Sequence, residues 1–185
     1  MPVNRVWGVD LTGKTDLLEG THPILGIVDH GSRLAVYLQA LPNKASITLL
    51  RALLDAIERF GKPRAVRSDN EAVFTSRLFR IALWTLGIRH QRTEPHCPWQ
   101  NGRVERFFGT LKSKLDRWAV DGRDELALAL GDFRAWYNHV RPHQHLGGWT
   151  PAEAWAGIDP YAAEPKSASY FSAWDGMLTG FHMRR

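Results

Sequence analysis

The chain has 185 residues, of which 44% are hydrophobic and 23% charged, a composition typical of one folded domain and not of a disordered chain. Its formal net charge of +5 and pI of about 9.7 favour anionic partners such as nucleic acid, although many basic proteins of this size bind none. The single cysteine, Cys97, excludes an internal disulfide and a multi-cysteine zinc site.

The sequence shows no feature of a secreted or membrane protein. Residues 1–5 lack the apolar stretch of a secretory signal, and the most apolar helical segment, Ile47–Ile57, carries Arg51 and Asp55. A chain with one cysteine also fits a reducing compartment. We therefore expect a soluble, cytoplasmic protein that does not contact a membrane.

The first part of the chain predicts three strands and a helix. Val6–Leu11 and Ile24–Asp29 are apolar runs typical of buried strands, and Arg33–Leu41 is a third strand that forms a hairpin with the second. Asn43 is a candidate N-cap for the following helix. Its apolar residues at 47, 50, 54 and 57 recur at helical spacing, and Gly61 with Pro63 ends it.

The second part alternates strands and helices. Arg64–Ser68 is a short strand that ends at Asp69, Thr75–Leu86 is a helix, and Ile88–Arg92 is a fifth strand. After the breaker-rich loop 94–100, two longer helices are expected, Asn101–Trp118 and Asp124–Val140. Their inward positions are 104, 107, 108, 111, 115 and 118 in the first and 126, 130, 133, 137 and 140 in the second. This order predicts an α/β fold with a mixed five-stranded sheet flanked by helices.

Three acids stand out against this framework. Asp10 lies in an otherwise apolar strand, where a carboxylate is costly to bury unless it is paired or binds a metal. Asp69 ends the fourth strand, where α/β proteins place ligand-binding groups, and Glu105 lies in the first turn of the long helix, expected to point toward the sheet. Such a trio suits Mg²⁺, with Mn²⁺ as a substitute. Taken singly, Asp69 is also compatible with a turn cap, and Glu105 with a solvated acid at a helix start.

The spacing of these acids and the residues around them resemble a known family. Asp10 in a strand, Asp69-Asn70 after a strand, and Glu105 after 35 further residues (70–104) are similar to the Asp, Asp-35-Glu signature of retroviral integrases and bacterial insertion-sequence transposases. The segment 100–106, continuing through Thr110-Leu111-Lys112, resembles the catalytic helix of that family. The later motifs resemble the end of bacterial insertion-sequence transposases: Tyr137-Asn138, Arg141-Pro142-His143, Leu146-Gly147 and Thr150-Pro151-Ala152-Glu153-Ala154.

The resemblance covers roughly residues 5–155 and implies a ribonuclease-H-like catalytic core. It implies that Asp10, Asp69 and Glu105 bind two divalent ions and catalyse hydrolysis at transposon ends, followed by attack of the new 3′-hydroxyl on target DNA. The implied partners are transposon-end and target DNA in the bacterial cytosol or nucleoid, and at least one further copy of the chain, since two DNA ends must be brought together.

Two departures from the family pattern affect this interpretation. Glu71 stands where many relatives have glycine, which adds an acid near the expected metal site. Relatives also carry a helical DNA-binding region before the core, whereas few residues precede the first strand here. The short segment before the first strand is compatible with three interpretations: an excised core, the second product of a split gene with a separate DNA-binding subunit, and a decayed remnant.

Several further residues are expected to support the reaction. Lys112 lies two helical turns after Glu105 and is expected to hold a DNA phosphate, with Arg103, Arg106 and Lys114 making the same helix basic. A merely solvated basic face is an open alternative for the arginines. Asn101 is expected to cap the helix, and DNA contact is also expected of Asn101 and Gln100.

Four further predictions concern the loops before the catalytic helix and the histidines. Gly102, with the preceding 98–100, favours a loop that changes shape when DNA binds. Trp99 is compatible with base stacking or with packing on the core. Asn70 is compatible with orienting Asp69 or a metal-bound water, or with a simple turn. His139, His143 and His145 lack the spacing of a zinc site, and His143 is expected to pack the loop after the last helix.

The remaining residues, 156–185, form a C-terminal extension to the core at 1–155. Apolar residues at 170, 174, 177, 178 and 181 suggest a helix, weakened by Gly176 and Gly180, that docks on the core or on a partner subunit. Two alternatives to an active strand transferase stay open. One is a stand-alone ribonuclease-H-like nuclease, and the other a catalytically silent DNA-binding or regulatory fragment of a transposase.

Overall fold

The computed structural model describes residues 1–16, 18, 20–93 and 101–185. The expectations for the loop 94–100, including those for Cys97, Trp99 and Gln100, lie outside the described residues. Within the described ranges, no helix is long and apolar enough to cross a lipid bilayer.

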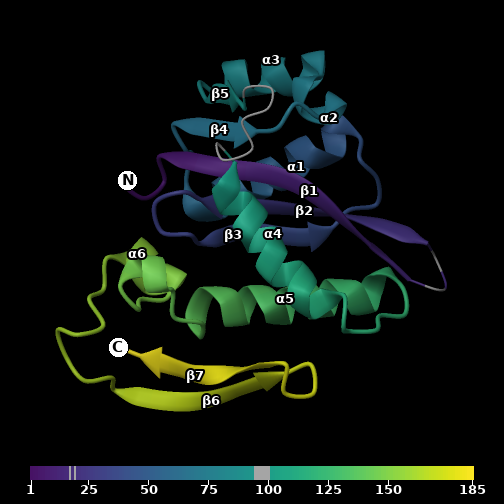
Figure 1. The fold of residues 1–185 in the computed structure, drawn as a ribbon. Helices are drawn as coiled ribbons and strands as arrows, with labels where there is room; N and C mark the ends of the chain where they lie inside the picture. The colour runs from purple at the N-terminus through teal and green to yellow at the C-terminus, as the bar shows by residue number, and fades with distance from the viewer. Residues whose placement is uncertain (17, 19, 94–100) are drawn as a thin grey trace.

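A mixed five-stranded sheet forms the centre of the fold, as the sequence predicts (Figure 1). Its strands are β1 (Val6–Thr15), β2 (Thr21–Asp29), β3 (Ala35–Ala40), β4 (Ala65–Ser68) and β5 (Arg89–Arg92), in the order β3-β2-β1-β4-β5. The first three strands are antiparallel neighbours, and β4 and β5 run parallel to β1.

The two faces of the sheet support separate hydrophobic clusters. Side chains alternate along a strand, so Trp7 and Val9 of β1 point to one face, where they pack with helix α1 (Ser46–Phe60) and helix α3 (Arg77–Thr85). The opposite face is covered by α4 (Gly102–Leu115), which crosses β1 and β2 in Figure 1 and buries the predicted stripe from Val104 to Leu115. Trp118, the last position of the predicted stripe, lies beyond the end of the helix and is partly buried.

Helix α5 (Arg123–His139) runs along the β3 edge of the sheet. The buried side chain of Asn138 accepts a hydrogen bond from the Ala35 N–H (2.9 Å) and donates one to the Ala35 carbonyl (3.1 Å). An edge strand otherwise exposes unpaired backbone groups. The Asn138 amide therefore satisfies both groups of one edge residue and fixes α5 against the sheet.

Two details of the first helix differ from the prediction. Helix α1 begins at Ser46 with Ala45 as its N-cap, because the Asn43 side chain instead accepts from the Ala45 N–H and the Thr48 hydroxyl. The spacing 47, 50, 54, 57 correctly predicts a helix, but Ile47 and Leu54 are exposed. The buried residues of this helix are Leu49, Leu50, Ala52, Leu53 and Ala56.

The helix expected over Thr75–Leu86 is α3, which begins two residues later than predicted, and a short helix that the sequence pattern does not predict, α2 (Ala72–Thr75), precedes it. Ser76 has an extended backbone between them, and its hydroxyl accepts from the Phe79 N–H, which caps α3. The side-chain cap at Ser76 therefore sets the start of α3 and separates it from α2.

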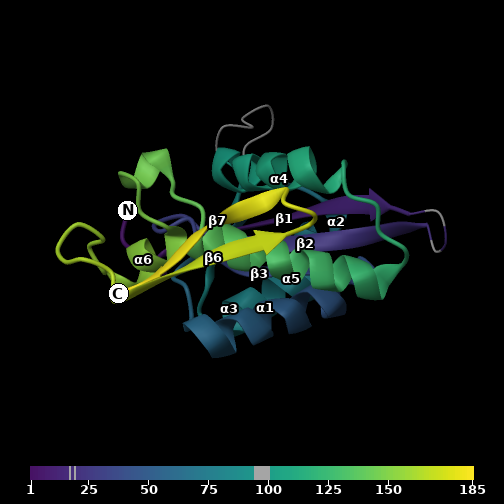
Figure 2. The ribbon, with the colours of Figure 1, turned by 90° about the horizontal axis from the view of Figure 1, so that it is seen from below.

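The C-terminal segment is a β-hairpin, and the helical interpretation of it is wrong. After α6 (Pro151–Ala156), strands β6 (Ser167–Ala173) and β7 (Leu178–Arg184) pair antiparallel and lie against α5 (Figure 2). Its turn requires left-handed backbone at Trp174, Asp175 and Gly176, with φ values of 52°, 48° and 84°. These conformations cannot continue a helix.

Aromatic and polar contacts attach the hairpin to the core. Trp174 is buried and stacks on Trp118, with ring centroids 5.7 Å apart, and Leu178 has no exposed surface. The Trp136 indole donates to the Thr179 carbonyl (2.9 Å). These contacts make the hairpin part of the hydrophobic cluster that also contains α4 and α5.

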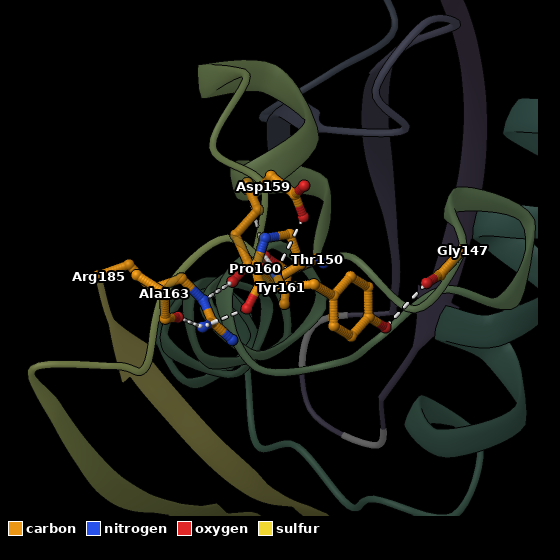
Figure 3. Close-up of polar contacts among 8 residues, drawn as sticks. Gly147, Thr150, Asp159, Pro160, Tyr161, Ala163 and Arg185 are labelled. Atoms are coloured by element: carbon orange, nitrogen blue, oxygen red, sulfur yellow. Dashed lines mark hydrogen bonds and ion pairs between the residues drawn. The ribbon is translucent and has the colours of Figure 1, made fainter.

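The end of the chain is attached to α6 (Figure 3). Glu153 accepts from the Thr150 backbone and hydroxyl in a capping box, and its other oxygen accepts from Arg185 Nε at 2.7 Å. Arg185 also donates to the carbonyls of Pro160 and Ala163, so it links three segments of the C-terminal region.

Candidate active site

Asp10 lies in the middle of β1 and points to the face of the sheet that α4 covers. A Cβ built on Gly8, two residues earlier, would lie 3.5 Å from Cβ of Val104 in α4. A Cβ built on Gly26, the β2 residue paired with Asp10, would lie 2.6 Å from the Phe108 ring. Residues two apart in a strand, and residues paired across strands, share a face. The Asp10 carboxyl therefore lies on the α4 side.

Asp69 follows the last residue of β4 and reaches the same level as Asp10. β4 is parallel to β1 with Gly8 paired to Arg67, so extending this register by two residues places Asp69 beside Asp10. The half-buried Asp69 carboxyl accepts the Glu71 N–H at 3.0 Å, which holds the turn after the strand. The two aspartates thus come from adjacent parallel strands.

Glu105 lies in the first turn of α4, between the buried residues Val104 and Phe107. Its side chain is exposed and lines a cavity of about 1060 Å³ beside α4, so it is less enclosed by the sheet than the sequence predicts. The packing of α4 on β1 nevertheless keeps this carboxylate on the same face of the molecule as Asp10.

Burial and neighbouring acids raise the pKa of Asp10 to about 7, from an ordinary value of 3.8. Loss of solvent is the largest cause, and the hydrogen bond from the Leu11 N–H (2.8 Å) opposes it in part. The negative charges that raise this pKa further belong to Asp69, Glu71 and Glu105. Asp10 therefore lies in the field of three other carboxylates.

The carboxylates of Asp10, Asp69 and Glu105 suit a hard divalent cation, although they are not grouped closely enough to form a complete metal site. Carboxylate oxygens are the ligands that Mg²⁺ and Mn²⁺ prefer, and a cation would offset the repulsion that raises the Asp10 pKa. In the described part of the chain, no three side chains of His, Cys, Asp or Glu are grouped closely enough to hold a metal ion. The residues fit a magnesium site in chemistry and placement, without a preformed three-ligand cluster.

The residues next to Asp69 have structural contacts of their own. The Asn70 side chain donates to the Thr93 carbonyl (2.9 Å), which ties the end of β4 to the segment that leaves β5. Glu71 is the N-cap of α2 and lies 3.8 Å from the Lys44 ammonium. The Glu71 carboxylate thus has a counter-ion outside the site, while its charge still acts on Asp10.

The basic residues of α4 differ in what they contact. Lys112 and Arg106 are exposed. Arg103 donates to the His30 carbonyl at 3.0 Å, and Lys114 donates to the Met177 carbonyl at 2.6 Å and lies over the Trp136 ring. Lys114 therefore attaches the C-terminal hairpin to α4, a role that its sequence position does not indicate.

The start of α4 also differs in detail from the prediction. Asn101 occupies the N-cap position but makes no side-chain capping bond, and its buried side-chain oxygen has no partner among the described residues. The ring of the buried His30 lies against Gly8, where a Cβ would meet it at 2.5 Å. Sequence reasoning did not single out His30, because its position beside α4 depends on the fold. His143 packs edge-on against Tyr137 of α5, as expected, with ring centroids 4.7 Å apart.

The chain matches a protein family over most of its length. Residues 2–98 match one family described as an integrase core domain, and residues 86–151 match a second family with the same description. An uncharacterized 39.2 kDa protein of the insertion element IS476 from Xanthomonas euvesicatoria is 36% identical over 158 residues. That alignment covers 81% of this chain and 44% of the relative, so the chain spans less than half of that protein.

Solved structures share the fold. The catalytic core domain of HTLV-2 integrase, in complex with magnesium and in a trimeric form, gives a TM-score of 0.66 at 22% identity, covering 82% of this chain and 95% of that one. A chain of the simian T-cell lymphotropic virus intasome, in complex with PP2A regulatory subunit B56 gamma, gives 0.71 at 24% identity, covering 96% and 66%. The predicted ribonuclease-H-like fold of integrase cores is confirmed.

Proposed function

Because this chain belongs to the integrase core domain family, we propose that it is a transposase core that cleaves and joins DNA at the ends of a mobile element with the help of divalent metal ions. The observation that carries the proposal is the arrangement of three carboxylates on one face of the sheet. Asp10 and Asp69 end up side by side on parallel strands, and α4 adds Glu105.

We assign metal binding to Asp10, Asp69 and Glu105, with Mg²⁺ as the natural ion and Mn²⁺ as its substitute. When bound, two such ions supply charge stabilisation for the attacking and leaving oxygens of an in-line phosphoryl transfer. The HTLV-2 core in complex with magnesium supports this choice of ion. The raised pKa of Asp10 means that this carboxyl releases a proton near neutral pH when it becomes a ligand.

Residues of α4 position the DNA in this proposal. Lys112 lies seven residues after Glu105, about 10 Å along the helix axis, and its exposed ammonium is placed to contact a backbone phosphate. Arg106 contributes a second exposed cation, whereas Arg103 is partly committed to the His30 carbonyl. Asn70 ties the end of β4 to the segment after β5 through the Thr93 carbonyl, and we assign DNA contact to Asn101 and a supporting role to Gly102 at the start of α4.

The proposed substrates are transposon-end and target DNA in the bacterial cytosol or nucleoid. Two DNA ends must be held together for insertion, so we propose that the active form contains at least two copies of the chain. We also propose that the core comprises residues 1–155 and that 156–185 is an extension of it. Sequence-specific recognition is assigned to a separate subunit or to the rest of a longer protein, since the match covers 44% of the IS476 protein.

The test is to incubate the full chain with Mn²⁺ and DNA that carries pre-cleaved ends of the element in which its gene lies. We expect joined product on a gel that resolves the strands. Nicked DNA without joining would indicate a nuclease, and binding without any covalent change would indicate a silent regulatory fragment. Either of these two results contradicts the proposal.

A further inference from the structure

A strongly basic cavity lies beside the proposed active site. It has a volume of about 1060 Å³, at the top of the range of roughly 300–1,000 Å³ typical of ligand sites. It opens between α4 and the segment that links α5 to α6. Its charged lining consists of one acid, Glu105, and the following arginines: Arg33, Arg103, Arg106 and Arg141.

Among the described residues, no salt bridge pairs an arginine of this cavity with an acid, although the charge of Asp29 acts on Arg33. The salt bridges found among the described residues join His22 to Asp16, Lys44 to Glu71 and Arg185 to Glu153, and none reaches the cavity. Four guanidinium groups carry more positive charge than Glu105 in the lining and the nearby Asp29 offset, so they repel one another. An anion that binds there would offset this repulsion through charge-assisted hydrogen bonds to the guanidinium groups.

Arg33 gives an independent sign of a built site. It lies in the turn between β2 and β3 with a left-handed φ of 67°, a conformation that is rare for a side chain of this size. Its Nη1 atom is buried and has no hydrogen-bond partner among the described residues. Burial and the charge of Arg103 lower the pKa of Arg33. The fold therefore holds a guanidinium in a costly position with an unused donor.

Arg141 is oriented by the residues around it. Its guanidinium lies over the rings of Trp136 and Tyr137, 5.7 and 5.8 Å from their centroids, and 3.5 Å from the His143 ring nitrogen. Stacking of this kind leaves the edge of the guanidinium plane available for a planar or tetrahedral anion. The motif Arg141-Pro142-His143 thus has a physical role beside α4.

The shape of the cluster favours an extended anion over a single ion. The four arginines come from the turn between β2 and β3, from α4 and from the segment that follows α5, so their charges line the cavity from several sides. Arg103 and Arg106 are three positions apart, a rise of about 4.5 Å along α4. A DNA strand carries a phosphate for about every 3.4 Å of helix axis, so a short stretch of backbone can meet several of these groups.

We propose that this cavity binds the sugar-phosphate backbone of the substrate DNA immediately next to Glu105, with Arg33, Arg106 and Arg141 contacting its phosphates. The inference rests on the proposed function for the identity of the DNA, but its binding site is separate from the metal ligands. The cavity would fix the direction in which the strand leaves the reacting phosphate.

The experiment measures binding of the full chain to a duplex oligonucleotide in EDTA, at several salt concentrations. Arg106→Gln and Arg141→Gln are compared with wild type and with Arg51→Gln, which removes an exposed arginine from α1 on the other face of the sheet. Each cavity variant should lower the slope of log affinity against log salt by about 0.9, and the control should leave it unchanged. Circular dichroism establishes that each variant is folded, and if Arg141→Gln is not, Arg106→Gln, which changes an exposed side chain, takes its place in both tests.

Duplexes in which one phosphate at a time is replaced by a neutral methylphosphonate then identify the phosphates that the cavity contacts. A neutral linkage that weakens wild-type binding should have less effect on Arg141→Gln, because the contact is already lost. The proposal is overturned if the cavity variants change the slope no more than Arg51→Gln does, if no position shows this coupling, or if an RNA duplex of the same sequence binds more tightly. Absence of joining activity with intact coupling would contradict the proposed function and leave the cavity assignment in place. Joining activity without this coupling would support the proposed function and contradict the cavity assignment.

Discussion

Replacing Asp10 by asparagine should stabilise the metal-free protein at neutral pH, because the substitution removes a charge that the fold holds unfavourably. The pKa of Asp10 rises from an ordinary value of 3.8 to about 7, a shift of roughly three units at about 1.36 kcal/mol each. That gives an upper bound of about 4 kcal/mol. Because the side chain is only partly buried, we expect about 2 kcal/mol, or roughly 4–8 °C in melting temperature.

The stability difference between Asp10→Asn and wild type should depend on pH. The folded protein binds the Asp10 proton more tightly than the unfolded chain does, so the contribution of the protonated carboxyl is fully present below about pH 3.8. It is lost as the pH rises through about 7. Urea unfolding in EDTA between pH 5 and pH 8 should therefore show the gap between Asp10→Asn and wild type widening with pH.

The matched control is Asp132→Asn, which neutralises an exposed acid on α5. It should leave the free energy of unfolding within about 0.5 kcal/mol of wild type at each pH. Refutation would come from an Asp10→Asn protein that is less stable than wild type at pH 7, or from a stability difference that does not change between pH 5 and pH 8. Either result would mean that Asp10 is solvated or already paired with a cation of the protein.

Three further predictions concern DNA binding and the fold. Lys112→Ala should lower the slope of log DNA affinity against log salt by roughly one unit, while Lys166→Ala in the C-terminal segment should leave it unchanged. Equal slopes for the two variants would show that Lys112 does not contact a DNA phosphate. The apolar face of α4 is buried against the sheet, so it cannot enter a DNA groove, and competition binding at near-physiological salt should show less than a thousandfold preference for the element's own ends. Asn138→Leu should cost about 2–4 kcal/mol in urea unfolding, because both backbone groups of Ala35 lose their partner, and a cost below about 1 kcal/mol would show that water replaces the amide.

The sheet and the catalytic helix could be predicted because their signals are local. Apolar runs bounded by turns fixed the five strands to within a few residues, and the stripe from Val104 to Leu115 identified α4. The C-terminal hairpin was missed although Asp175-Gly176 is a common hairpin turn. Consecutive aromatic residues at 170 and 171 obscured the two-residue alternation, since one side chain is exposed and the other packs on the core.

The three acids of the site could be predicted from the sequence, but the residues around them could not. Asp10 and Asp69 each end or interrupt a strand pattern, so their adjacency follows from the order of the strands. The exposure of Glu105 and the raised pKa of Asp10 depend on tertiary packing. The basic cavity unites residues 33, 106 and 141, which lie far apart in the sequence, and no local pattern connects them.

The measurement that tests the central assignment most directly is metal-dependent joining of element-end DNA by Glu105→Gln, beside wild type and Glu71→Gln. If Asp10, Asp69 and Glu105 hold the metal ions, Glu105→Gln should lose at least about a hundredfold in joining rate, as expected for removal of a group that stabilises the transition state. Glu71, which pairs with Lys44, should tolerate the same change with a far smaller loss. A Glu105→Gln protein that joins DNA at close to the wild-type rate would contradict the assignment.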